Sequence, residues 1–170
     1  IKVLLSGEGA DELFGGYDRI YNWFKDNKFK FDDFLRLYCY SKPRKGSKVY
    51  VKLKNELGKI SIKDGFNKLR YFFIKYHLPI LLRRLDFSLM LAGVEGREPF
   101  LSKNIFYEAL KYKPSELMSQ EYKIGKMPLR NLVKDIFDKK FYLQKKIGFP
   151  VNLKKIFSEK KYKYDLSLIH

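Results

Sequence analysis

The sequence has 170 residues, of which 45% are hydrophobic and 17% aromatic, a composition that supports a packed core and argues against disorder. The formal charge of +17 is compatible with a polyanionic ligand or a nucleic-acid partner, although basic residues spread along a whole chain more often form a solvated surface. The single cysteine, Cys39, excludes an internal disulfide and a zinc site built from several cysteines, and it fits a reducing cytosol.

The first predicted element is a short buried strand over residues 1–5, because these residues are almost continuously apolar, as in parallel strands covered on both faces. A glycine-containing turn over residues 6–9 follows it. Helices are predicted over residues 10–14, 17–25, 31–40, 62–76, 79–91, 103–112 and 128–137. One strand followed mainly by helices is typical of the trailing part of an α/β domain.

Local signals set the predicted boundaries. Ser61 is expected to cap the helix over 62–76, and the segment 77–79, which contains a proline, is expected to end it. Residues 41–48 hold a proline, a glycine and four basic side chains, which predicts an exposed basic loop. A turn-rich segment is expected over residues 93–101 and a compact loop over 145–150. The apolar runs are too short to cross a bilayer and no secretory signal opens the chain, so we expect a cytoplasmic protein.

The turn after the first strand has the features of an anion-binding site. It joins a strand to a helix N-terminus, where free backbone N–H groups favour an anion. Gly7 and Gly9 allow the backbone to approach a phosphate closely, and the Ser6 hydroxyl can donate a further hydrogen bond.

Three carboxylates, those of Glu8, Asp11 and Glu12, lie in the same turn and would repel a bare phosphate. A magnesium ion removes this conflict, because it binds one or two carboxylates together with phosphate oxygens. The segment is therefore interpreted as a magnesium–polyphosphate site, with one carboxylate left for proton transfer. The alternative is an ordinary helix whose first-turn acids are favoured by the helix dipole.

Residues 6–17 read Ser-Gly-Glu-Gly-Ala-Asp-Glu-Leu-Phe-Gly-Gly-Tyr. This string resembles the signature Ser-Gly-Glu-Gly-(Ala/Ser)-Asp-Glu-(Leu/Val)-Phe-Gly-Gly-Tyr of the glutamine-hydrolysing asparagine synthetase family. The resemblance implies the C-terminal portion of a Rossmann-like ATP-pyrophosphatase domain, of the adenine nucleotide alpha hydrolase-like kind, which adenylates a carboxylate and forms an amide.

The same resemblance implies roles for single residues. ATP phosphates would contact Ser6, Gly7, Glu8 and Gly9, and Asp11 would ligate magnesium, with Glu12 the weaker candidate. Glu8 would also be a catalytic carboxylate that handles a proton when ammonia attacks.

A second block, residues 78–101, resembles the family pattern in which a Leu-Pro…Leu-Leu-Arg-x-Asp helix precedes Val-Glu-Ala-Arg-Val-Pro-Phe-Leu-Asp. Glu95 and Arg97 are candidates to orient substrate, and the alternative is that they form a structural ion pair. Arg83 and Asp86 lie near one face of a helix, where they form either a surface ion pair or a functional pair. Three departures concern the acceptor rather than the fold: Gly96 replaces Ala, Glu98 replaces Val and Ser102 replaces Asp.

A third block, residues 126–150, resembles a family segment in which a Lys-x-x-Leu-Arg helix is followed by Arg-x-Lys-x-Gly-Phe. Here Lys126, Leu129 and Arg130 begin a helix, and residues 144–150 read Gln-Lys-Lys-Ile-Gly-Phe-Pro. Lys146 stands at the position of the family's active-site lysine, which implies that it stabilises charge on an adenylate and a tetrahedral intermediate. The alternative is a solvated lysine among other lysines. Gln144 replaces the usual Arg, so one expected charge is missing. His77 and His170 have no metal-ligand companions, and His77 is expected to be structural.

Residues 1–170 are accordingly expected to form a partial synthetase domain. The chain contains no Ser-Gly-Gly-x-Asp-Ser loop, the family's second ATP-binding motif, and this loop and a glutaminase domain are expected upstream of Ile1.

The implied reaction uses Mg-ATP to adenylate aspartate and ammonia from glutamine to form asparagine, AMP and pyrophosphate, in an enzyme that can be a homodimer. Alternatives are a relative that amidates a peptide, a sugar acid or another carboxylate, an inactive remnant, and a basic nucleic-acid-binding module. The chain alone is expected to be inactive.

Overall fold

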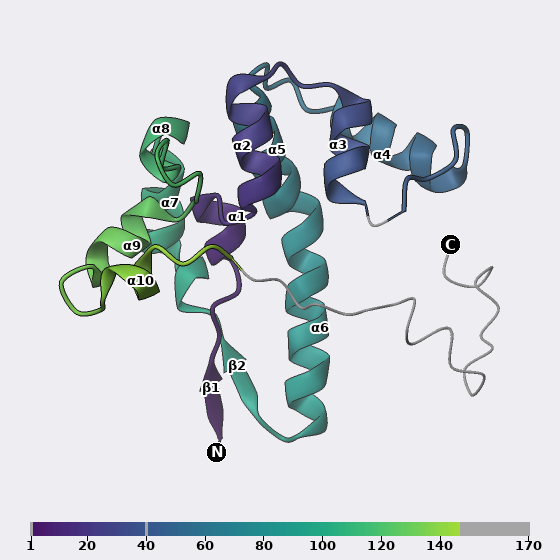
Figure 1. Ribbon diagram of the computed structural model, residues 1–170. Helices are drawn as coiled ribbons and strands as arrows, with labels where there is room; N and C mark the ends of the chain where they lie inside the picture. The colour runs from purple at the N-terminus through teal and green to yellow at the C-terminus, as the bar shows by residue number, and fades with distance from the viewer. Residues whose placement is uncertain (1, 40, 147–170) are drawn as a thin grey trace, which may run out of the picture.

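The computed structural model describes residues 2–39 and 41–146, and it shows a helical head from which a narrower part projects (Figure 1). Two strands, β1 (Val3–Leu5) and β2 (Glu95–Arg97), lie in the projecting part beside the C-terminal half of the longest helix. The helices are α1 (Ala10–Phe14), α2 (Asp18–Asp26), α3 (Phe31–Tyr38), α4 (Lys48–Gly58), α5 (Gly65–Phe72), the π-helix η1 (Phe73–His77), α6 (Leu78–Leu91), the 3₁₀-helix η2 (Pro99–Leu101), α7 (Lys103–Lys111), α8 (Pro114–Leu117), α9 (Met127–Val133) and α10 (Lys139–Tyr142).

The two strands form a parallel pair in the register Val3↔Glu95, Leu4↔Gly96 and Leu5↔Arg97. The sequence predicts one strand, and β2 lies where turns are expected; a three-residue strand with two charged side chains and a glycine carries no apolar pattern to reveal it. The prediction of a buried β1 is wrong for the described residues, because the strand pairs with β2 along one edge and Val3, Leu4 and Leu5 are 42%, 40% and 71% exposed.

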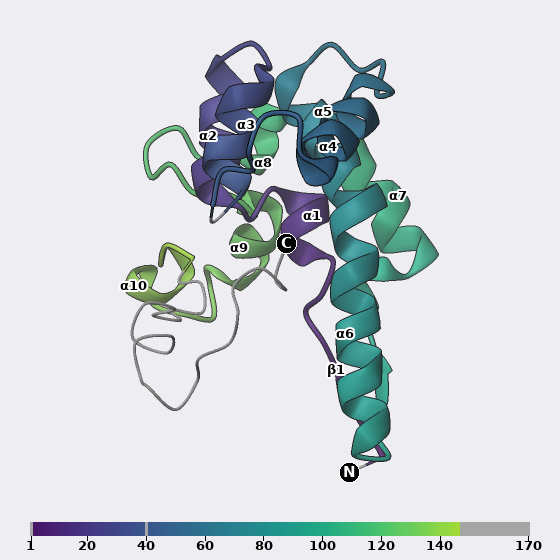
Figure 2. The same ribbon diagram turned by 90° about the vertical axis from the view of Figure 1, so that its right-hand side faces the viewer.

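Helices α5, η1 and α6 follow one another without a break from Gly65 to Leu91 (Figure 2), so the predicted end at residues 77–79 is wrong. Proline lacks an N–H donor, and its ring crowds the preceding helical turn. Here the wider π-helical turn Phe73–His77, which ends just before Leu78 and Pro79, accommodates the proline, so the helix continues. The cap of α5 is Asp64, whose Oδ1 accepts the Asn67 N–H at 2.7 Å, rather than the predicted Ser61.

Helix α4 has no counterpart among the predicted helices. It begins at Lys48 after Ser47, whose Oγ accepts the Tyr50 N–H at 3.3 Å. Its Val-Tyr-Val start has low intrinsic helix propensity, which hides the helix from a pattern search. Residues 41–47 connect α3 to α4 and are mostly exposed.

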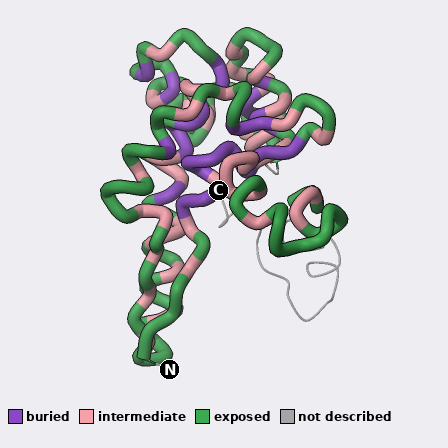
Figure 3. The backbone as a smooth tube through the Cα atoms, turned by 90° about the vertical axis from the view of Figure 1, so that its left-hand side faces the viewer, coloured by how far each residue is buried: buried purple, intermediate pink, exposed green. Residues whose placement is uncertain are grey.

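The core of the head is built from aromatic side chains. The almost fully buried ones include Tyr21, Phe24, Phe34, Phe66, Phe72 and Phe73. Tyr21 on α2 packs on Phe66 of α5 with ring centroids 4.5 Å apart. Removing one such ring from water contributes about 1.5–3 kcal/mol. Buried residues concentrate in the head and exposed ones in the projecting part (Figure 3), and α1, which joins the two parts, packs into the core through Leu13 and Phe14.

Candidate functional site

The junction between β1 and α1 places Ser6 to Gly9 at the carboxyl end of the sheet. The Ser6 N–H donates to the Arg97 carbonyl at 2.8 Å, and the Ser6 Oγ accepts the Glu8 N–H at 3.2 Å. Gly9 has φ of 90°, and a Cβ there would lie 2.4 Å from Leu101 Cδ2, so packing and backbone conformation both require glycine. A Cβ on Gly7 would meet no atom of the described residues within 4 Å, which leaves its backbone open to a ligand on this side.

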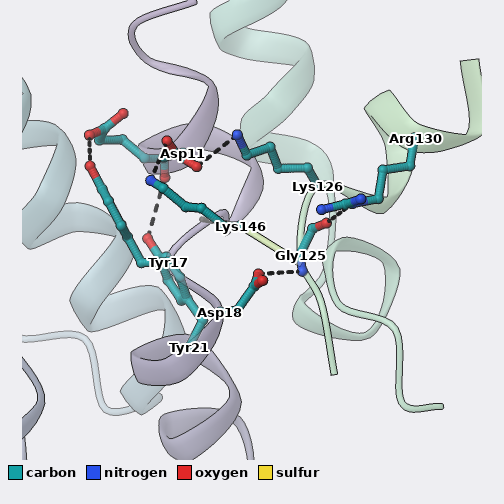
Figure 4. Close-up of polar contacts among 9 residues, drawn as sticks. Asp11, Tyr17, Asp18, Tyr21, Gly125, Lys126, Arg130 and Lys146 are labelled. Carbon is teal, nitrogen blue, oxygen red and sulfur yellow. Dashed lines mark hydrogen bonds and ion pairs between the residues drawn. The ribbon is translucent and has the colours of Figure 1, made fainter. Parts of the chain in front are cut away.

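Asp11 lies between two lysines that are remote from it in sequence (Figure 4). Lys126 Nζ is 2.8 Å from Asp11 Oδ1, and Lys146 Nζ donates to Asp11 Oδ2 at 2.7 Å. All three side chains are largely withdrawn from water, with 23%, 27% and 33% exposure for Asp11, Lys126 and Lys146. We call these three residues the Asp11 cluster.

Glycines and an unusual backbone conformation give the cluster its shape. A Cβ on Gly16 would lie 1.8 Å from Asp11 Oδ1 and 2.3 Å from Lys126 Cε, so only glycine leaves room for the ion pair. Lys126 has φ of 61°, a left-handed conformation that is costly for a residue with a side chain. Its N–H donates to the Phe14 carbonyl at 2.9 Å, which holds this strained residue against α1.

The electrostatics of the cluster keep Asp11 ionised. Burial alone would raise the pKa of Asp11, but the ammonium groups of Lys126 and Lys146 outweigh burial and hold the pKa below its usual value. Lys126 approaches Oδ1 without hydrogen-bond geometry, so this buried oxygen has no hydrogen-bond donor within the described parts of the chain. Two ammonium groups around one carboxylate leave an excess positive charge that suits a phosphate.

Glu12 points the other way, into the protein. It is 1% exposed and accepts a hydrogen bond from the Tyr17 hydroxyl. Burial raises the pKa of Glu12, and the bond from Tyr17 opposes this effect only in part. The Tyr17 ring also lies 4.3 Å from Lys146 Nζ, a cation–π contact that steadies the lysine. Glu12 therefore acts on the Asp11 cluster indirectly, because it holds Tyr17, whose ring contacts Lys146.

The other predicted site residues lie outside the Asp11 cluster. Glu8 is half-buried, and Arg84 of α6 approaches it to 3.9 Å; Arg84, rather than Arg83, thus reaches a carboxylate from this helix. Glu95 and Arg97 are exposed on β2 and form an ion pair with each other at 3.0 Å. In this structure they therefore form the ion pair that the sequence offered as the alternative to substrate binding. Gly148, Phe149 and His170 lie outside the described residues.

From the sequence, Lys126 is expected only to begin a helix, and the structure places its ammonium group beside Asp11 as the second cation of the site. No local sequence pattern predicts that Lys126 pairs with Asp11. The pairing depends on the left-handed backbone of Lys126 and on Gly125, whose N–H donates to Asp18 Oδ1 at 2.8 Å.

Within residues 2–39 and 41–146, no group of three or more His, Cys, Asp or Glu side chains is arranged to hold a metal ion. Asp11 supplies one carboxylate, whose Oδ1 is approached by the Lys126 ammonium at 2.8 Å. This donor set fits magnesium only where phosphate and water supply the remaining oxygen ligands, which is the usual arrangement for magnesium bound with a nucleotide. No helix in the described parts of the chain is long and apolar enough to cross a membrane.

The parallel strand pair and the charged cluster near its carboxyl end define an α/β protein whose candidate site lies at the strand ends, where open α/β sheets commonly bind their ligands. The asparagine synthase family model matches residues 1–167, and the chain belongs to this family, which confirms the resemblance found in the sequence.

A relative described as a putative glutamine-hydrolysing asparagine synthetase from Methanocaldococcus jannaschii is 32% identical over 135 residues, which make up 77% of this chain. The chain spans 19% of the length of that relative. No solved structure matches the chain.

Proposed function

We propose that this chain forms one wall of the active site of an ATP-dependent amide ligase, and that the Asp11 cluster binds the phosphates of ATP. The observation that carries the proposal is the position of Lys126 and Lys146 on either side of Asp11, at 2.8 and 2.7 Å. Partly buried ammonium groups attract phosphate oxygens more strongly than exposed ones, because less water screens them. Family membership over residues 1–167 supports the use of ATP.

Asp11 would hold magnesium through Oδ1, with Lys126, which now lies 2.8 Å from this oxygen, turning to the phosphates. Magnesium bound there together with ATP would neutralise phosphate charge. Lys126 and Lys146 would bind phosphate oxygens as point charges, and the Tyr17 ring would keep the Lys146 ammonium in place. The open backbone at Gly7 would allow Ser6 to Gly9 to contact the same phosphates.

The proposed reaction has two steps. A carboxylate oxygen of the acceptor attacks the α-phosphorus of ATP and displaces pyrophosphate, which gives an acyl-adenylate. Ammonia then attacks the acyl carbon, transfers a proton to Glu8 and expels AMP. Lys146 would stabilise the negative charge of the adenylate and of the tetrahedral intermediate. Glu8 suits proton transfer because it is only loosely paired, with Arg84 at 3.9 Å.

The first acceptor to assay is aspartate with ammonia from glutamine, because the relative from Methanocaldococcus jannaschii is described as a glutamine-hydrolysing asparagine synthetase. The second candidate is a larger carboxylic acid, which is favoured by the open cavity described in the next section. We also propose Arg97 and Glu95 as residues that orient the acceptor, with their mutual ion pair opening when it binds.

We propose further that the Ser-Gly-Gly-x-Asp-Ser loop and a glutaminase domain come from segments outside this chain, in a cytoplasmic enzyme that can form a homodimer. The apolar surface along β1 and α6 supports such packing, because Leu5, Phe87 and Leu91 are 71%, 63% and 92% exposed. The isolated chain would then bind nucleotide weakly and catalyse nothing. A remnant without activity and a nucleic-acid-binding module remain the alternatives to be excluded.

An oxygen-18 transfer experiment tests the reaction type. The full-length protein that carries this chain is incubated with Mg-ATP, ammonia and an acceptor labelled with oxygen-18 in its carboxylate. Adenylation transfers one labelled oxygen to AMP. Label in inorganic phosphate, together with ADP, would mean phosphorylation of the acceptor instead, and would contradict the proposal. Absence of label from every product, with each candidate acceptor, would favour the inactive alternatives.

A further inference from the structure

An open cavity of about 780 Å³ adjoins the Asp11 cluster and is used by none of the steps above. It lies between α2, α3, the π-helix η1 and the segment that carries Lys145 and Lys146. Its wall includes three aromatic side chains, those of Tyr17, Tyr38 and Phe73. Tyr17 and Lys146 belong both to this cavity and to the surroundings of Asp11, so a molecule in the cavity would reach the proposed phosphate site.

The π-helix gives this wall its form. Single π-helical turns are rare and are found frequently at functional sites, since they cost backbone stability. Here the turn places Phe73 and His77, its first and last residues, on the same cavity. His77 Nδ1 lies 3.0 Å from the Tyr38 hydroxyl, which joins η1 to α3 across the cavity floor. The wall is thus fixed by a hydrogen bond as well as by packing.

The charges around the cavity favour an acid. Among the described lining residues there are four cations, those of Arg19, Lys123, Lys145 and Lys146. Asp18 is the one carboxylate of that set, and its Oδ1 already accepts the Gly125 N–H at 2.8 Å. Burial, and after it the charges of Lys146 and Arg84, lower the pKa of His77, so this histidine tends to stay neutral and the positive charge of the cavity comes from the four cations.

We propose that this cavity binds the apolar or aromatic body of a carboxylic acid, and that the acid's carboxylate lies at Lys146 beside the Asp11 cluster. This inference rests on the proposed function, since it names the acceptor class for the same site. A cavity of this size lies in the range that accommodates drug-sized molecules. Free aspartate has no apolar surface to place against three aromatic rings, and its ammonium group would face several cations.

The test uses 4-(4-fluorophenyl)butyrate as a probe and follows its binding to the full-length protein by fluorine NMR. Alkylation of Cys39 by iodoacetamide gives a second readout, because Cys39 lines the cavity and its modified peptide can be quantified by mass spectrometry. We expect saturable binding with a Kd of about 1 mM, slower alkylation of Cys39 at saturation, and at least tenfold weaker binding of the matching amide and of aspartate.

A variant that fills the cavity separates specific from nonspecific binding. Leu37 lines the cavity and is half-buried, so Leu37→Trp should weaken probe binding at least tenfold. Leu132→Trp is the matched control, because Leu132 is 74% exposed on α9 and lies outside the cavity lining. Circular dichroism melts establish that both variants are folded.

Binding that is unchanged in Leu37→Trp would overturn the inference, and so would equal binding of the amide, or protection of Cys39 by AMP but not by the acid. Probe binding without any oxygen-18 transfer would leave this acid site standing and remove the proposed ligase function. Oxygen-18 transfer from aspartate without probe binding would support the proposed ligase function and overturn the acid site.

Discussion

Replacing Gly16 with alanine tests whether the Asp11 cluster is as tightly built as the geometry indicates. Gly16 does not have a left-handed φ, so alanine suits its backbone, and only the space matters. The new Cβ would lie 1.8 Å from Asp11 Oδ1 and 2.3 Å from Lys126 Cε. The carboxylate must therefore leave its position between the two lysines. Overpacking of this kind costs about 2 kcal/mol, which in a chain of this size lowers Tm by about 4–8 °C.

Two comparison variants make the Gly16→Ala experiment decisive. Gly7→Ala should keep the wild-type Tm in a thermal melt followed by circular dichroism, because its Cβ meets nothing within 4 Å. In an Asp11→Ala background the added cost of Gly16→Ala should fall below about 1 kcal/mol, since the remaining contact is with the flexible end of Lys126. A wild-type Tm for Gly16→Ala, or an equal cost with and without Asp11, would refute this reasoning.

Three further predictions concern charge and exposure. Glu12→Gln should raise Tm at pH 7 and leave it unchanged below pH 4.5. Burial raises the pKa of Glu12 in the folded protein, so the wild-type protein loses stability as pH rises through this folded-state pKa, and glutamine does not. An equal Tm for variant and wild type across this pH range would contradict a buried Glu12 charge. Arg70→Met should cost about 2 kcal/mol in urea unfolding, because Arg70 is 3% exposed and donates to the carbonyls of Ala109 and Tyr112. Phe87→Lys should raise the soluble yield at unchanged Tm, whereas Phe24→Lys, at a position 1% exposed, should unfold the protein.

The sequence identified the chemical groups of the site better than their arrangement. Asp11 and Lys146 are both marked by motifs, and the structure brings them to 2.7 Å across 135 positions of chain. The sequence predicts Lys126 only as the start of a helix, because its place beside Asp11 depends on a backbone φ of 61° and on the missing side chain of Gly16, neither of which leaves a pattern in neighbouring residues. The inward orientation of Glu12 depends on Tyr17, five positions later, and was equally hidden.

The fold shows the same division between local and tertiary causes. The short helix α1 has the predicted bounds, because its two terminating glycines are a local signal. The strand β2 forms because Glu95 to Arg97 lie beside β1, a contact between residues about 90 positions apart. The continuous helix through η1 depends on a π-helical turn that no propensity scale records. Predictions from sequence therefore succeed where the cause is local and fail where it is a distant neighbour.

The most direct test of the central claim is ATP–pyrophosphate exchange by the full-length protein in the presence of its acceptor. The account predicts that Lys146→Ala lowers the exchange rate at least 100-fold, because the ammonium group beside Asp11 and Tyr17 is lost. Lys140→Ala is the control, because Lys140 is an exposed lysine on α10, and it should leave the rate and the Tm unchanged. An exchange rate in Lys146→Ala equal to that of wild type would contradict the assignment of the Asp11 cluster as the phosphate site.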